Sequence, residues 1–272
     1  MSYGAALSER SSTGYPAAMK IGPCCLITGA SSGLGRALAL ALAAPGRHLL
    51  LSGRNEDRLA EAASLCRARG ASAMPTVIDV TDEVAMRRWI TSAGRLDLVI
   101  ANAGISAHTA GLSGEEATRA IFATNLGGVL NTVLPALEIM AGQPRGSEGG
   151  RGRIAAINSI AAFVASPEAP AYCAAKAAAD RWILAVAPIA ERNAVHLTSV
   201  CPGFIRTPMT DAHNRPKPGM MSAERAAAII LAGIAKNRRR IAFPYPLYLA
   251  SRFVSLLPPR AAAALITRFG KD

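Results

Sequence analysis

The sequence predicts one α/β domain built on a doubly wound parallel sheet of about seven strands, with helices on both faces. Two observations lead to this fold class. Short apolar segments alternate with longer Ala- and Leu-rich segments along most of the chain, as strands and helices do in βαβ units. The short segments are apolar almost throughout, which is typical of strands covered on both faces. A length of 272 residues suits one large domain of this kind.

The individual elements follow from this alternation. Seven apolar segments are expected to form strands: residues 24–28, 48–53, 74–80, 96–104, 153–160, 195–203 and 241–244. Helices are expected over residues 36–44, 55–70 and 82–93, and in stretches that begin near residues 115, 171 and 223. Asp82 and Ser222 stand where an N-cap would satisfy the free amides of a helix start. The polar, Gly-rich residues 143–153 are expected to be a surface loop.

Composition excludes several classes of protein. Hydrophobic residues make up 51% of the chain and charged residues 18%, which excludes a disordered or fibrous chain. The longest uncharged run, residues 120–137, is interrupted by Asn, Gly and Pro, so no transmembrane helix is expected. Residues 1–20 lack the basic and apolar regions of a secretory signal and are expected to be a disordered leader. The odd count of five cysteines, with no CxxC pair, favours a reducing, cytoplasmic compartment and no zinc site.

The positive charge is concentrated at the C-terminal end. The formal net charge is +12, and residues 213–272 carry eleven Lys or Arg against two acidic residues, a net of +9. Within this region, Lys236 to Arg240 form a basic cluster. Apolar residues at helical spacing follow at Leu249, Phe253, Leu256 and Leu257. Nucleic-acid binding is not expected, because the region lacks interleaved aromatic residues on a recognised module.

A glycine-rich turn joins the first expected strand to the first expected helix. It reads TGASSGLG from Thr28 to Gly35, with the spacing GxxxGxG. Glycines let a backbone approach a pyrophosphate closely, and the helix that follows offers free amides and a partial positive charge. A glycine triplet alone is weak evidence, but its place between strand and helix favours a dinucleotide site in a Rossmann-type fold.

The end of the second expected strand bears on cofactor choice. It reads Ser52-Gly53-Arg54-Asn55, with a cation where a carboxylate would hold a ribose 2′-hydroxyl. This favours NADP(H) over NAD(H); in the alternative interpretation, Arg54 is an exposed turn residue. Asp79-Val80, which closes the third expected strand, either touches the adenine ring or caps the helix near Asp82.

Three residues form a candidate catalytic set. Tyr172 and Lys176 lie four residues apart in an Ala-rich stretch, so a helix presents both on one face. The ordinary pKa of a phenol is about 10, and a nearby ammonium favours the phenolate, which suits tyrosine for proton transfer. The Ser159 hydroxyl, near the end of a strand, is placed to bind a carbonyl oxygen. Taken singly, a YxxxK pair is more often a surface pair and Ser159 a turn residue.

Taken together, these motifs resemble the single-domain short-chain dehydrogenase/reductase family. The resemblance covers about residues 23–209. It rests on the glycine turn, Asp79-Val80, Ala101-Asn102-Ala103-Gly104, Asn125, Ser159, Tyr172, Lys176, and the stretch from Cys201-Pro202-Gly203 to Thr207.

The resemblance implies a role for each matched residue. Tyr172 would protonate the carbonyl oxygen, Ser159 would orient it, and Lys176 would hold the nicotinamide ribose and lower the tyrosine pKa. Asn125 would kink its helix and hold a water in a proton relay. The expected cofactor-binding residues are Gly29, Ser31, Ser32, Gly33, Leu34, Gly35, Arg54, Asp79, Val80, Asn102, Ala103, Gly104, Tyr172, Lys176, Pro202, Gly203 and Thr207. No metal is required, and a homodimer or homotetramer is the family expectation.

Three positions depart from the family pattern. Ala101 replaces the first Asn of NNAG, the serine motif reads NSIAA, and Pro188 falls within the helix after Lys176, where it is expected to kink or end that helix. The first two changes leave the Ser159 hydroxyl available.

The remaining segments bear on substrate and location. Residues 204–222, with Met209, His213, Met220 and Met221, are expected to be a mobile lid over an adaptable apolar pocket. Residues 21–245 would form the catalytic domain and residues 246–272 a basic amphipathic extension. That extension either docks peripherally on a membrane or packs on the protein or a second subunit.

The expected function is an NADP(H)-dependent oxidoreductase that interconverts a ketone or aldehyde and an alcohol by hydride transfer, on an apolar or lipid-like substrate. Within enzymes, the alternative is reduction of a 3-oxoacyl thioester. Outside enzymes, the alternative is a nucleotide-sensing or scaffold protein on the same fold, against which Asn125, Ser159, Tyr172 and Lys176 argue.

Overall fold

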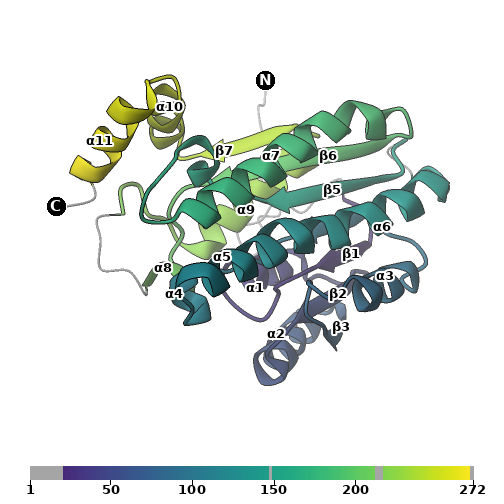
Figure 1. The fold of residues 1–272 in the computed structure, drawn as a ribbon. Coiled ribbons are helices and arrows are strands. Elements are labelled where there is room, and N and C mark those ends of the chain that lie inside the picture. Colours follow the sequence, from purple (N-terminus) through teal and green to yellow (C-terminus); the bar gives the residue numbers. More distant parts are fainter. Residues whose placement is uncertain (1–20, 147–148, 212–216, 270–272) are drawn as a thin grey trace, which may run out of the picture.

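A parallel sheet with helices on both faces forms the body of the protein (Figure 1). The computed structural model describes residues 21–146, 149–211 and 217–269. The leader expected over residues 1–20 lies outside the described residues. The strands are β1 (Cys24–Ile27), β2 (His48–Gly53), β3 (Ser72–Val77), β4 (Leu98–Ala101), β5 (Gly152–Ile157), β6 (Val195–Pro202) and β7 (Arg240–Phe243). Their order is β3-β2-β1-β4-β5-β6-β7 and every pairing is parallel, which confirms the predicted fold class.

The longer helices form two layers. These helices are α1 (Gly33–Leu42), α2 (Glu56–Ala68), α3 (Glu83–Thr91), α5 (Gly114–Phe122), α6 (Gly128–Gly142), α7 (Pro170–Glu191) and α9 (Ala223–Ala235). The apolar core on one face joins α1, α2 and α9 to the sheet, and the core on the other face joins α3, α6 and α7 to it. All four residues of β4 are buried, as an apolar strand between two helical layers requires.

The direction in which strands are added to the sheet reverses between β1 and β4. From β1 the chain moves outward to β2 and β3, then returns to β4 and continues in the other direction to β7. In open parallel sheets, ligands bind at the carboxyl ends of the strands beside such a switch point.

The third strand ends earlier than the sequence predicted. β3 spans Ser72–Val77, so Asp79 and Val80 follow it instead of closing it. This strand lies at the sheet edge and contains Pro75. An edge strand tolerates a proline because only one side of its backbone is paired.

The long helical run from Gly114 to Gly142 contains a π-helical segment, η1 (Ala123–Gly127), between α5 and α6. By length and composition this run could cross a membrane, and half of its most apolar window is buried. Val129, Val133, Ala136 and Met140 belong to the apolar core, so the helix is explained as a core element. Pro188 lies inside α7, which continues to Glu191, so the proline does not end that helix.

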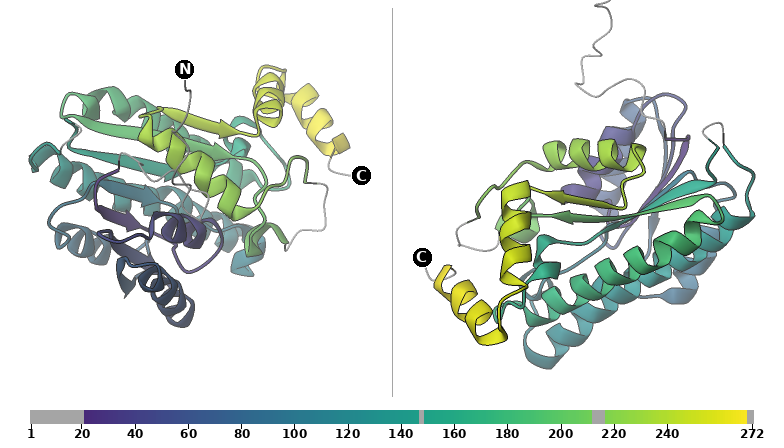
Figure 2. Two further views of the ribbon diagram at one scale, coloured as in Figure 1. Left: turned by 180° about the vertical axis from the view of Figure 1, so that it is seen from behind. Right: turned by 90° about the horizontal axis from the view of Figure 1, so that it is seen from above.

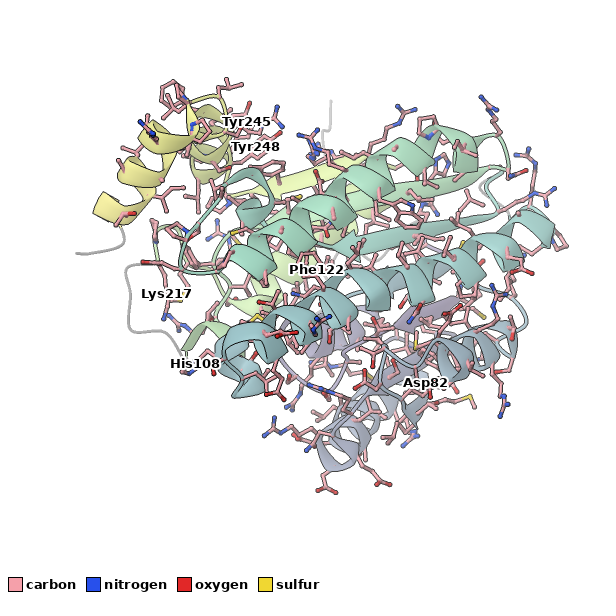
Figure 3. All side chains as sticks on the ribbon, in the orientation of Figure 1. Asp82, His108, Phe122, Lys217, Tyr245 and Tyr248 are labelled. Atoms are coloured by element: carbon pink, nitrogen blue, oxygen red, sulfur yellow. The ribbon has the colours of Figure 1, made fainter. Side chains whose placement is uncertain are left out.

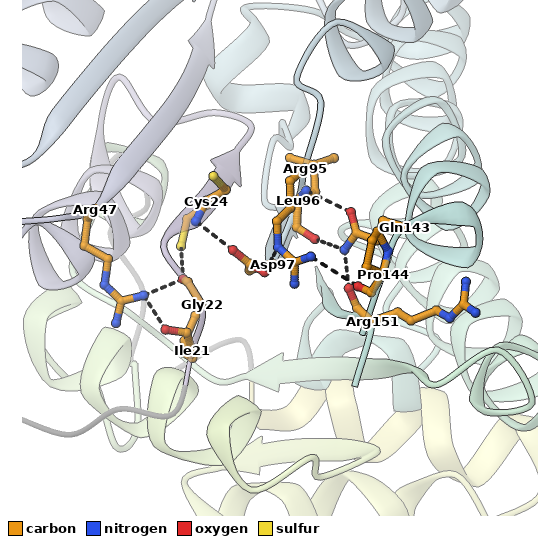
Figure 4. A network of polar contacts seen from close by, with 11 residues as sticks. Ile21, Gly22, Cys24, Arg47, Arg95, Leu96, Asp97, Gln143, Pro144 and Arg151 are labelled. Atoms are coloured by element: carbon orange, nitrogen blue, oxygen red, sulfur yellow. Dashed lines mark hydrogen bonds and ion pairs between the residues drawn. The ribbon is translucent and has the colours of Figure 1, made fainter. Parts of the chain in front are cut away.

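Polar contacts fix the amino ends of the central strands (Figure 4). The buried Asp97 carboxylate accepts a hydrogen bond from the Cys24 amide at 3.0 Å and pairs with Arg95 at 2.9 Å. The Gln143 side chain bonds both backbone groups of Leu96, at 2.7 and 3.1 Å. The candidate active site lies at the opposite end of the sheet, where the strands have their carboxyl ends.

Two further helices follow β7. They are α10 (Tyr245–Val254) and α11 (Pro259–Phe269), in the region where the sequence predicted a basic amphipathic extension over residues 246–272. α10 lies beyond the end of β7, and α11 projects away from the body of the molecule (Figure 2).

Candidate active site

The predicted site residues come from separate segments that meet at the carboxyl ends of β1, β4, β5 and β6. The glycine turn follows β1, the Asn102–Gly104 stretch follows β4, Ser159 follows β5, and Pro202-Gly203 ends β6. Each lies just after its strand, where side chains are free to face a ligand above the sheet.

The glycine turn adopts a backbone that few other residues would allow. Gly29 and Gly33 have φ values of +65° and +52°, in the left-handed region. A Cβ on Gly35 would overlap the carbonyl oxygen of Gly29. The glycines of the motif are therefore needed for the shape of this turn.

Asn102 holds the turn in place. Its side-chain Nδ2 donates to the carbonyl oxygens of Thr28 and Gly29, at 3.0 and 3.1 Å. Its own amide donates to the Thr28 hydroxyl at 3.0 Å. The ends of β1 and β4 are thus locked together beside the turn.

The start of α1 fits the pyrophosphate of a dinucleotide. Ser32 is the N-cap, and its side chain makes no capping hydrogen bond to the first turn of the helix. The first-turn amides, next to a turn that has no Cβ atoms at its glycines, remain for an anion. Thr207 lies against this turn, because a Cβ on Gly33 would be 3.1 Å from Cγ2 of Thr207.

An exposed cation follows the end of β2. Arg54, with its side chain 63% exposed, lies 3.8 Å from the Asp79 carboxylate. Asp79 also accepts bonds from the amide and hydroxyl of Thr81, both at 2.9 Å, so it caps this turn. The helix α3 is capped by Asp82, which accepts from the Ala85 amide. Val80 is buried and its carbonyl accepts a bond from Asn131.

Ser159 and Tyr172 lie near each other at the end of β5. Ser159 caps the 3-10 helix η2 (Ile160–Phe163) and accepts a bond from the Ala161 amide at 3.1 Å. Tyr172 stands in the first turn of α7, near enough to the Ser159 hydroxyl for that group to oppose the rise in the tyrosine pKa. Strand end and helix start thus bring the two hydroxyls together.

Lys176 lies one helical turn after Tyr172 and is buried. Its Nζ donates to the carbonyl oxygen of Ile157 at 2.8 Å and lies 5.9 Å from the centroid of the Tyr172 ring. Burial lowers the lysine pKa to about 8. In the same site burial raises the pKa of Tyr172, and the hydrogen bond to Ser159 only partly opposes this.

The raised pKa of Tyr172 differs from the expected lowering by Lys176. The physical reason is partial desolvation of the half-buried tyrosine, while the Lys176 ammonium donates its hydrogen bond to the Ile157 carbonyl. Without bound cofactor, Tyr172 is therefore protonated at neutral pH. The protonated phenol is the form that can donate a proton.

Asn125 is fully buried within the π-helical segment. Its Oδ1 accepts from the Ile105 amide at 2.8 Å, and its Nδ2 donates to the Ile105 carbonyl at 2.9 Å. A Cβ on Gly104 would lie 3.1 Å from Asn125 Oδ1 and 3.4 Å from Lys176 Nζ. The glycine therefore allows these two side chains to lie close to the chain that follows β4.

Comparison with known proteins agrees with this geometry. Residues 23–218 match the model of the family described as short chain dehydrogenase. The chain belongs to the short-chain dehydrogenase/reductase family. It is therefore an oxidoreductase of a family whose members use a nicotinamide dinucleotide.

Individual family members are similar to this chain in sequence and structure. An uncharacterized oxidoreductase of Myxococcus xanthus is 33% identical over 238 residues, which cover 86% of this chain and 92% of that protein. The granaticin polyketide synthase putative ketoacyl reductase 1 of Streptomyces violaceoruber is 33% identical over 197 residues, 70% of each chain. The crystal structure of a short chain dehydrogenase from Mycobacterium paratuberculosis bound to NAD has a TM-score of 0.72 and 25% identity, and the match covers 85% of this chain and all of that one.

The loop over residues 204–222, where the sequence predicted a lid over the substrate, is described except for residues 212–216. The ends of the loop over residues 204–222 are joined, since Ile205 pairs with Met221 and the Arg206 amide donates to the Met221 carbonyl at 2.9 Å. α8 (Pro208–Asp211) lies within the loop, and Met209 and Met220 are half-buried. His213 lies outside the described residues. A mobile lid stays a prediction.

Sequence reasoning missed a buried ion pair behind the catalytic set. Asp180, one turn after Lys176 on α7, pairs with Arg240 of β7 at 2.5 Å and accepts a 2.6 Å bond from Ser199. The Arg240 guanidinium lies 5.1 Å from the centroid of Phe163, in the short helix that Ser159 caps. An acid four residues from Lys176 on a helix was the available signal, because it falls on the same face.

Proposed function

We propose that this protein interconverts a ketone or aldehyde and an alcohol, with NADP(H) as its cofactor and an apolar or lipid-like molecule as its substrate. The observation that carries the proposal is the grouping of Ser159, Tyr172 and Lys176, with the Ser159 hydroxyl near the phenol and the Lys176 ammonium 5.9 Å from the tyrosine ring. These groups stand beside a glycine turn and a helix start that fit a dinucleotide.

The chain's own residues divide the proton chemistry between them. Ser159 donates a hydrogen bond to the substrate carbonyl oxygen and orients it. Tyr172, protonated because burial raises its pKa, donates a proton to that oxygen in reduction and accepts one in oxidation. Lys176 presents its charge close to the phenol, where it stabilises negative charge as the proton leaves. The cofactor, when bound, supplies or accepts the hydride.

Arg54 supports the preference for NADP(H). The segment Ser52 to Asn55 offers no carboxylate for a ribose 2′-hydroxyl, and the exposed Arg54 guanidinium suits a 2′-phosphate. Its contact with Asp79 at 3.8 Å is longer than a hydrogen bond and exposed to water, so a phosphate would displace it at little cost.

One observation favours a second candidate substrate. The relative from Streptomyces violaceoruber is named a putative ketoacyl reductase, and its likeness covers 70% of this chain. A 3-oxoacyl thioester presents a ketone to the same three residues. The basic residues of the C-terminal region would meet an acidic carrier of such a thioester.

A substrate screen tests the proposed function. Purified full-length protein is mixed with NADPH or NADH and a panel of apolar ketones, aldehydes and 3-oxoacyl thioesters, and absorbance of the reduced cofactor is followed. The expected result is NADPH-dependent turnover of at least one carbonyl class, lost in Ser159→Ala. Tight NADPH binding without turnover of any carbonyl or alcohol in the panel would favour the nucleotide-sensing alternative and contradict the proposal.

A further inference from the structure

An apolar stripe that no other described residue covers runs along the outer side of α10. Its members recur every three or four residues, as one helix face requires, and end just past the helix. They are Tyr245, Leu249, Phe253 and Leu256, with exposed fractions of 64, 49, 62 and 79%. Large apolar side chains that gather on one exposed face mark an interaction surface.

The stripe is held outward by contacts on the opposite side of the helix. Tyr248 meets the Phe163 ring edge-on at 5.4 Å, and the Arg252 guanidinium lies 5.5 Å from the same ring. Leu247 packs beside Gly203, where a Cβ would lie 3.1 Å from it. Tyr245 and Tyr248 are both labelled in Figure 3, at the end of the molecule where α10 and α11 lie. The apolar face is therefore a fixed feature of the fold.

The charge around this stripe has one sign. Between Glu224 and Asp272 the sequence contains no acidic residue and nine basic ones: Arg225, Lys236, Arg238, Arg239, Arg240, Arg252, Arg260, Arg268 and Lys271. Arg239 and Arg240 pair with Glu191 and Asp180 of α7. Arg252 of α10 is half-buried, with its guanidinium against Phe163, whereas Arg260 in the first turn of α11 is exposed. The outer helices are thus basic and apolar together.

We propose that α10 and α11 form a docking surface for an anionic lipid membrane. The apolar stripe of α10 would enter the boundary between headgroups and acyl chains, while the arginines contact lipid phosphates. A second copy of this chain fits less well. In a two-fold pairing the same acid-free basic segment would face itself, and like charges would be brought together. A negatively charged lipid surface neutralises the same residues.

The position of α10 connects this surface to the active site. Its inner side touches Gly203, which follows the Pro202 end of β6, and Phe163, four residues after Ser159. A membrane bound to the outer side would lie one helix away from Gly203 and Phe163, beside the proposed site. Delivery of an apolar carbonyl compound from the lipid phase rests on the proposed function. Membrane docking itself does not depend on that function.

Vesicle sedimentation of the full-length protein tests the proposal. Vesicles of phosphatidylcholine alone are compared with vesicles of phosphatidylcholine and phosphatidylserine, at low and raised salt. We expect binding to the anionic vesicles only, weakened by salt. Phe253→Gln with Leu256→Gln should lower that binding by roughly tenfold or more, since it removes two large apolar side chains from the stripe. Both residues are exposed, so the fold should be kept.

A matched variant controls for apolar surface in general. Val84 and Ile189 are exposed to 69 and 57% on α3 and α7, outside the stripe. Val84→Gln with Ile189→Gln should leave vesicle binding unchanged. Circular dichroism verifies that each variant is folded.

Two outcomes would overturn the proposal. One is equal sedimentation of wild type and the stripe variant with anionic vesicles. The other is the absence of vesicle binding together with a change of oligomeric state in the stripe variant by analytical ultracentrifugation, which would make α10 a subunit interface. Neither readout needs enzyme activity, so failure of the proposed reaction would be seen separately.

Discussion

The Nζ atom of Lys176 donates a 2.8 Å hydrogen bond to the carbonyl oxygen of Ile157, the last residue of β5. The bond fixes the ammonium at the sheet end from which Ser159 also comes, two residues later along the chain. It places the charge 5.9 Å from the Tyr172 ring without a direct contact with the phenol oxygen. Strand, 3-10 helix and α7 therefore set the spacing of the three groups together.

Burial of Lys176 should be visible in the pH dependence of stability. Its pKa is about 8 in the folded chain, below the ordinary value of 10.5. Between these two pH values the unfolded chain holds a proton that the folded chain has lost, so wild-type stability should rise with pH. Relative to Lys176→Met, the free energy of unfolding should increase by about 2 kcal/mol from about pH 7 to about pH 9.5.

Urea unfolding of the cofactor-free protein measures this difference. The comparison with Lys176→Met removes the titration of the other groups, which both proteins share. A difference between the two proteins that stays constant over the same pH range would show that the ammonium is not desolvated in the folded chain.

The glycine turn predicts a contrast between two helical glycines. Gly35→Ala places a Cβ onto the Gly29 carbonyl oxygen, so we expect a loss of about 2 kcal/mol or more in stability and a severe loss of cofactor binding. Gly142→Ala, in the last turn of α6, meets no atom within 4 Å and should be neutral or stabilising by up to about 1 kcal/mol. Thermal unfolding and cofactor fluorescence read both effects, and equal behaviour of the two variants would contradict the account of the turn.

Arg54 predicts a change in cofactor preference. If its guanidinium binds a 2′-phosphate, Arg54→Ala should weaken NADPH binding by roughly tenfold to a hundredfold, the worth of one charge-assisted hydrogen bond. NADH binding should stay unchanged. Arg88→Ala, at an exposed arginine on α3, is the control. Fluorescence titration would refute the assignment if wild-type protein bound both cofactors equally well.

The pair of Asp180 and Arg240 should matter more for stability than a surface pair. Asp180→Asn leaves the Arg240 guanidinium largely buried without its counter-ion, and we expect a loss of about 3 kcal/mol. Glu191 lies on the same helix as Asp180 and forms a more exposed pair with Arg239. Glu191→Gln, which breaks that pair, should have a much smaller effect. Urea unfolding at neutral pH compares the two; similar losses would mean that burial of the first pair contributes little.

The order of strands and helices was predictable because each strand is a short apolar run that ends at a turn. Local patterns also gave two N-caps, since Asp82 and Ser222 each accept a bond from the amide three residues later. The π-helical segment and the continuation of α7 through Pro188 could not be derived from periodicity. Both depend on the packing of α6 and α7 against the sheet, which compensates for lost backbone hydrogen bonds.

The site was predictable in its membership but not in its electrostatics. Ser159, Tyr172 and Lys176 meet because β5 ends and α7 begins at the same end of the sheet. The raised pKa of Tyr172 depends on how much water the fold excludes, which no motif records. The Asp180 to Arg240 pair was missed because its partners are 60 residues apart and meet only once β7 lies beside β6.

The most direct test of the central claim is the rate of carbonyl reduction by Tyr172→Phe. The substitution removes only the phenol hydroxyl near Ser159, so the packing of the half-buried ring and the glycine turn should be kept. The account predicts that turnover falls by roughly a hundredfold to ten-thousandfold, the usual contribution of a positioned acid, while the dissociation constant for NADPH changes little. Turnover equal to that of the wild type, with the same cofactor affinity, would show that the proton comes from another group.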